Sequence, residues 1–95
     1  MITISIDCPP GSTRPDSYFK YIVNEIVGNS DASQEAKDYI KVYADKEKDC
    51  ACFGEWTWKL EEPKNNRIRE EIISYFRISL TKFHQQGAIR YASFS

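Results

Sequence analysis

Cys8 and Arg14 are the two residues whose types and spacing come nearest to a catalytic arrangement. They are separated by five residues, in the order Cys8-Pro-Pro-Gly-Ser-Thr-Arg14, between a predicted first strand and a predicted first helix. A cysteine thiolate is a strong nucleophile, and an arginine together with backbone N–H groups at a helix start can hold phosphate oxygens. The loop is therefore a candidate site for attack of sulfur on a phosphoryl group.

The C-x5-R spacing resembles the phosphate-binding loop of phosphotyrosine phosphatases, which implies Cys8 as the nucleophile and Arg14 as the phosphate ligand. This chain departs from the family pattern at three positions. Pro9 and Pro10 have no N–H groups to donate to a phosphate, and Pro15 replaces the hydroxyl residue expected after the arginine. The alternative interpretation is a proline-stiffened loop that leads into a helix.

Cys8, Cys50, Cys52 and His84 are the residues that could be combined into a zinc site. The C-x-C spacing of Cys50 and Cys52 differs from the C-x2-4-C spacing that is usual for zinc ligands. Free cysteines are more often small core residues, and an odd number of cysteines, three, fits a reducing compartment. No serine or aspartate is placed by the sequence to form a triad with His84. The sequence therefore predicts no metal and no cofactor.

Length and composition predict one domain, residues 1–95, without a membrane segment. The chain is 41% hydrophobic and 14% aromatic, which is typical of a globular domain. No apolar run approaches the roughly 20 residues that a membrane helix needs. The first residues, MITISID, lack the basic region of a signal peptide. These features predict a cytoplasmic protein.

Three segments have the alternating pattern of strands that bury one face, at 2–6, 50–60 and 88–94. The segment 50–60, CACFGEWTWKL, places both tryptophans of the chain on one face, so the main core is expected against it. Gly54 inside this segment predicts a bulge or a close contact with a neighbouring strand.

Three helices are predicted at about 15–27, 33–46 and 66–86. Thr13 is the expected N-cap of the first helix, and Tyr21 lies off the apolar face of that helix. Gly87 is the expected C′ residue of the last helix. Residues 33–46 also contain a shorter strand pattern, but the helical pattern fits more positions.

Together these elements predict an α+β fold, with a three-stranded sheet packed with helices. A strand, a helix and a strand joined by short turns place the strands 50–60 and 88–94 parallel to each other. If residues 39–45 instead form a strand, that strand pairs with 50–60 as a hairpin. The order then becomes βαββαβ, which is ferredoxin-like.

The charges are divided unequally along the chain. The net charge is −1, but residues 1–63 hold 7 basic and 12 acidic residues, giving −5, and residues 64–95 hold 6 basic and 2 acidic residues, giving +4. The acidic part could meet a basic surface and the basic part an acidic one. The competing explanation is that helix faces of mixed charge are simply solvated.

Aromatic residues with neighbouring cations suggest a platform on which single-stranded nucleic acid could stack. Its members would include Trp56, Trp58 and Tyr91, with Arg77 and Arg90. Against this alternative, tryptophans on the buried face of a strand are more often core residues. A net charge near zero also argues against nucleic-acid binding by the whole surface.

The segments ISIDCPPGSTRPDSYF, FGEWTWKL and GAIRYASF are similar to those of small phage and prophage proteins, and the chain resembles the anti-CRISPR type. This resemblance implies a non-enzymatic inhibitor that binds a host protein or ribonucleoprotein complex and blocks DNA recognition. An acidic patch could locally imitate DNA phosphates in a basic channel, and an exposed isoleucine with nearby cations could add contacts. The candidates for the acidic patch are Asp31, Glu35, Asp38, Asp45, Glu47 and Asp49. The candidates for the additional partner contacts are the isoleucine Ile78 and the cations Arg67, Arg77, Lys82 and Arg90.

Overall fold

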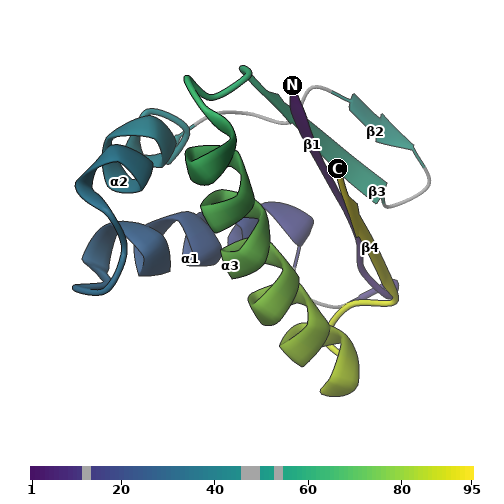
Figure 1. Ribbon diagram of the computed structural model, residues 1–95. Coiled ribbons are helices and arrows are strands. Elements are labelled where there is room, and N and C mark those ends of the chain that lie inside the picture. The colour runs from purple at the N-terminus through teal and green to yellow at the C-terminus, as the bar shows by residue number, and fades with distance from the viewer. Residues whose placement is uncertain (12–13, 46–49, 53–54) are drawn as a thin grey trace.

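The computed structural model describes residues 1–11, 14–45, 50–52 and 55–95 of the chain. Its elements follow in the order β1 (Ile2–Asp7), α1 (Pro15–Gly28), α2 (Gln34–Lys41), β2 (Cys50–Cys52), β3 (Glu55–Leu60), α3 (Asn66–Gln85) and β4 (Tyr91–Phe94). The strands form one sheet in the order β2-β3-β1-β4, with antiparallel neighbours. Figure 1 shows the three helices on one side of this sheet. The predicted α+β fold is confirmed.

β1 is a central strand because β3 pairs with one of its edges and β4 with the other. Ile4 of β1 lies opposite Trp58 of β3 and Phe94 of β4. Ser5 lies opposite Thr57, and the two side-chain oxygens share a hydrogen bond of 2.9 Å. Because side chains alternate along a strand, the isoleucines of β1 face the helices and these hydroxyl groups face the other side.

The segment predicted as one strand, 50–60, consists of two strands. β2 runs antiparallel to β3 and pairs Cys50 with Thr57 and Cys52 with Glu55. The prediction was wrong here because the period-2 pattern of two short strands resembles that of one long strand. Gly54, which was expected to mark a bulge, lies outside the described residues.

α2 is shorter than the predicted helix 33–46. It ends at Lys41, and residues 42–45 form turns. The proposed strand at 39–45 is therefore wrong. The βαββαβ order that accompanied it is nevertheless present, with β2 in the hairpin and α2 as an added helix. β3 and β4 both run antiparallel to β1, which lies between them, so they are parallel as predicted.

The ends of α3 explain why β4 begins at Tyr91 and not at residue 88. The side chain of Asn65 caps the first turn by accepting a hydrogen bond from the N–H of Ile68. At the other end Gly87 has a φ of 75°, and the N–H of Ala88 donates to the carbonyl of Phe83 at 3.0 Å. This Schellman ending occupies the residues that precede β4.

The N-cap position of α1 is Arg14, whose side chain makes no capping hydrogen bond. The predicted cap, Thr13, lies outside the described residues. Pro15 occupies the first helical position, where a missing N–H costs little. Among the described residues, no helix is both long and apolar enough to cross a membrane.

The core lies between the sheet and the helices. Trp58 of β3, Phe19 of α1 and Phe76 of α3 are fully buried. The rings of Phe19 and Trp58 stack with centroids 4.4 Å apart and 2° between their planes. Isoleucines of β1 and α3 complete the same cluster. The sheet face that carries Trp58 is therefore the inner face, as the sequence predicts.

Candidate protein-contact surface

A groove between α1 and α3 exposes apolar side chains at its rim. Tyr18 and Tyr21 of α1 contact Phe83 of α3, with ring centroids 4.8 and 5.6 Å apart. The groove consists of two adjoining hollows of about 410 and 120 Å³. We call it the aromatic groove and define it by Tyr18, Tyr21, Glu25, Ile78, Lys82 and Phe83.

Two large apolar side chains at the aromatic groove are more than half exposed. Ile78 is 67% exposed and Tyr21 is 53% exposed. Lys82 lies one helical turn beyond Ile78 and makes no ion pair with another described residue. Exposed apolar and aromatic residues beside an unpaired cation are typical of protein contact sites.

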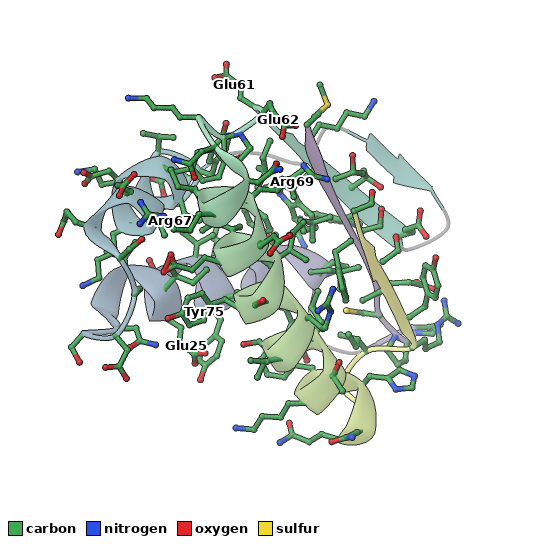
Figure 2. The ribbon with its side chains drawn as sticks, in the orientation of Figure 1. Glu25, Glu61, Glu62, Arg67, Arg69 and Tyr75 are labelled. Carbon is green, nitrogen blue, oxygen red and sulfur yellow. The ribbon has the colours of Figure 1, made fainter. Side chains whose placement is uncertain are left out.

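Glu25 connects the two walls of the aromatic groove. Its carboxylate accepts a hydrogen bond of 3.3 Å from the hydroxyl of Ser79 on α3. A hydrogen bond to Glu25 also raises the pKa of Tyr21, with a further contribution from the negative charge. Figure 2 shows Glu25 beside α3, on the side of the molecule away from the sheet. The carboxylate of Glu25 therefore links α1 to Ser79 of α3 at the edge of the groove.

The predicted acidic residues on α2 are paired with cations. Glu35 forms an ion pair with Arg67 of α3. Figure 2 shows Arg67 reaching towards α2, while Arg69 reaches towards the N-terminus and Glu62. Asp38 is 3.2 Å from Lys41, and its hydrogen bonds with Gln34 and Lys41 lower its pKa. These charges are compensated locally.

Of the remaining acidic candidates, the structure describes Asp31 and Asp45. Asp31 precedes α2, and its N–H donates to the side chain of Asn29 at 2.8 Å. Asp45 is exposed in the turns after α2. Glu47 and Asp49 lie outside the described residues.

The predicted basic residues are divided between different sides of α3. Ile78 and Lys82 meet in the aromatic groove. The guanidinium of Arg77 lies over the ring of Phe94, 5.5 Å from its centroid. Arg90 binds both carboxylate oxygens of Asp7, at 3.0 and 3.1 Å. Of these four residues, Ile78 and Lys82 line the aromatic groove, whereas Arg77 and Arg90 do not.

The environment of Cys8 favours the neutral thiol. Its side chain is buried, and burial raises its pKa, with a further rise from Asp7 and an opposing effect of Arg90. Arg14 points elsewhere, with its guanidinium 4.9 Å from the centroid of Trp56 and its Nε 3.8 Å from Asp16. A nucleophilic cysteine needs a lowered pKa and an accessible sulfur, so these features oppose the role that the C-x5-R spacing suggests.

Cys8 is expected to react slowly with iodoacetamide in the folded protein. In a Cys50→Ser, Cys52→Ser background, alkylation at pH 8 should be about tenfold slower or more than in urea, because burial hides the sulfur and reduces its thiolate fraction. Because the pKa of the Cys8 thiol is raised in the folded protein, the unfolded chain loses the thiol proton at a lower pH than the folded chain. The free energy of unfolding should therefore decline as the pH rises above about 9. Cys8→Ser should remove that contribution to the decline. Rapid alkylation of the native protein at pH 7 would contradict this account and favour a catalytic thiolate.

The aromatic residues of the suggested stacking platform do not share one open surface. Trp58 is fully buried, Trp56 is partly buried with Arg14 above it, and Tyr91 is 51% exposed. Stacking with bases needs an accessible ring face, which Trp58 lacks. The described residues also contain no group of three or more His, Cys, Asp or Glu side chains that could hold a metal ion.

The sequence predicted part of the aromatic groove. Ile78 and Lys82 were candidates, and Tyr21 was recognised as lying off the apolar face of its helix. Tyr18, Phe83 and Glu25 were missed, although the groove depends on them. One sequence feature could have indicated the groove: Tyr21 and Ile78 are both large residues on the polar faces of their helices. No protein-family model, curated protein or solved structure matches this chain.

Proposed function

We propose that this protein is a non-enzymatic inhibitor that binds a host defence complex in the cytoplasm and blocks its recognition of DNA. The observation that supports binding is the aromatic groove, where Tyr21 and Ile78 are exposed beside Phe83. The class of target follows from the resemblance of the sequence to anti-CRISPR proteins. The partner is a protein or ribonucleoprotein complex.

The chemistry of the aromatic groove specifies what the partner presents. An apolar side chain fits between Tyr21 and Ile78, and a carboxylate beside it reaches Lys82. Tyrosine at the centre of a protein interface often contributes about 2–4 kcal/mol to binding. Loss of such a contact weakens binding by about 30- to 1000-fold.

The test compares Ile78→Asp and Tyr21→Ala with a matched control, Val42→Asp. Val42 is 70% exposed, close to the 67% of Ile78, but it lies at the end of α2 outside the aromatic groove. Exposed positions tolerate such changes within about 0.5 kcal/mol of stability, so all three variants should fold. Circular dichroism and thermal unfolding check this.

Inhibition is measured with purified CRISPR surveillance complexes and a labelled target DNA in an electrophoretic mobility assay. The wild-type protein and Val42→Asp are expected to prevent DNA binding, whereas Ile78→Asp and Tyr21→Ala lose this effect. Plating of a targeted phage on a strain with active CRISPR defence should follow the same order. If all four proteins inhibit equally, the aromatic groove is not the contact. If the wild-type protein leaves every complex unaffected, the proposed target class is wrong.

A further inference from the structure

The aromatic groove carries one negative and one positive side chain. Glu25 of α1 and Lys82 of α3 both line its smaller hollow, of about 120 Å³. The other side chains that line the two hollows are uncharged. Glu25 and Lys82 are both exposed, and neither forms an ion pair with another described residue. The groove therefore presents one charge of each sign, and both are accessible to a partner.

Glu25 can accept contacts from outside the chain as well as within it. Its carboxylate accepts a hydrogen bond of 3.3 Å from the hydroxyl of Ser79 and another from the side chain of Tyr21. The two oxygens of a carboxylate offer about four acceptor positions, so positions remain for an added cation. The ammonium group of Lys82 can in turn donate several hydrogen bonds to an added carboxylate.

Exposed apolar side chains accompany the two charges, with one on each wall of the groove. Tyr21 of α1 is 53% exposed and Ile78 of α3 is 67% exposed. Burial of apolar surface stabilises a complex roughly in proportion to the area removed from water. The surface that fits this groove best therefore offers apolar side chains together with one carboxylate and one cation.

A second copy of this chain offers that combination of side chains. In a dimer with two-fold symmetry, the same surface of each copy meets the other, so every contact between two different residues occurs twice. Glu25 of each copy can then pair with Lys82 of the other. A partner surface of a single charge sign, such as a nucleic acid, would instead place a like charge opposite either Glu25 or Lys82.

We propose that a second copy of this chain occupies the aromatic groove in a symmetric dimer. Glu25 of each copy pairs with Lys82 of the other, and the exposed side chains of Tyr21 and Ile78 are buried between the copies. The dimer covers the surface that inhibition requires, so self-association holds the protein inactive and dilution releases it. This consequence for inhibition rests on the proposed function, whereas the dimer itself does not.

The test is sedimentation velocity of the full chain at increasing concentration, from about 1 μM to 1 mM, which covers the affinities of transient contacts. The wild-type protein is expected to shift from monomer to dimer within this range. Val42→Asp, which lies outside the groove, should dimerise as the wild type does. Circular dichroism checks that each variant is folded.

Charge reversal assigns the dimer to the aromatic groove. Glu25→Lys and Lys82→Glu should each weaken dimerisation by about tenfold or more, because each places two like-charge pairs across the two-fold axis. An equimolar mixture of these two variants should dimerise again, since both pairs then have opposite charges. The double variant should recover for the same reason. If Glu25→Lys fails to fold, Glu25→Gln keeps an acceptor for Ser79, removes the charge and should also weaken the dimer.

Three outcomes would overturn the proposal. The first is a wild-type protein that stays monomeric up to about 1 mM. The second is a dimer that both charge reversals leave unchanged, which would place the contact on another surface. The third is a mixture of the two variants that associates no better than either variant alone.

The dimer and the proposed function can fail separately. A monomeric protein that still prevents DNA binding would overturn the dimer and leave the inhibitory function in place. A dimer that leaves every surveillance complex unaffected would do the reverse.

Discussion

Replacing Trp58 by alanine is expected to lower the free energy of unfolding by about 3–5 kcal/mol. Its side chain is fully buried and stacks on the ring of Phe19. The ring centroids of Phe19 and Phe76 are in turn 5.7 Å apart. The substitution removes the largest side chain of the core and leaves a cavity that neighbouring rings fill only in part. Such a loss is a large share of the roughly 5–15 kcal/mol that stabilises a small domain.

Urea unfolding followed by circular dichroism measures this loss, with Trp56→Ala as the matched control. Trp56 is on the same strand but only partly buried, so its replacement should cost less. Trp58→Phe should fall between wild type and Trp58→Ala, because the buried Nε1 of Trp58 has no hydrogen-bond partner to lose among the described residues. An equal cost at Trp56 and Trp58 would show that the stacked pair is not the centre of the core.

Replacing Glu71 by alanine is expected to cost about 2–3 kcal/mol of stability. The carboxylate on α3 accepts two hydrogen bonds from Ser33, one from its N–H at 2.9 Å and one from its hydroxyl at 2.7 Å. The same hydroxyl caps α2 by accepting from the N–H of Ala36 at 3.1 Å. Removal of Glu71 therefore loosens the start of α2 and its attachment to α3.

The neighbouring Glu70 provides the control, because it has the same chemistry but is exposed. Glu70→Ala should change stability by no more than about 0.5 kcal/mol. The costs of Ser33→Ala and Glu71→Ala should not add in the double variant, since the two residues act through shared hydrogen bonds. Additive costs would mean that the two side chains act independently and that the described hydrogen bonds contribute little.

The sequence predicted α3 well because both of its ends carry local signals. Asn65 caps the first turn and Gly87 adopts the positive φ that ends the last one. The hairpin of β2 and β3 was missed because alternation continues through the segment, and its one glycine, Gly54, was interpreted as a bulge or a close contact. The end of α2 was also missed, since the apolar spacing continues to Tyr43 and Ala44 although the helix stops at Lys41.

The candidate sites were only partly predictable because they form where distant segments meet. Ile78 stood out as an apolar residue on the polar face of its own helix. Tyr18 and Phe83, in contrast, belong to the apolar faces of α1 and α3, and the groove arises only when the two rings meet at 4.8 Å. Likewise, Glu71 meets Ser33 across 38 residues of sequence. Patterns within one element do not specify such contacts.

The position of β1 has a consequence for the rate at which this protein folds. It is the first strand of the chain, yet its partners are distant in sequence. Ser5 meets Thr57 across 52 residues and Asp7 meets Arg90 across 83. Long loops must close before either ladder gains its hydrogen bonds, and loop closure costs chain entropy. The hairpin of β2 and β3 and the helices are local and can form early. Completion of the sheet around β1 is then the slow step, with folding in the range of milliseconds or longer that non-local strand pairing imposes.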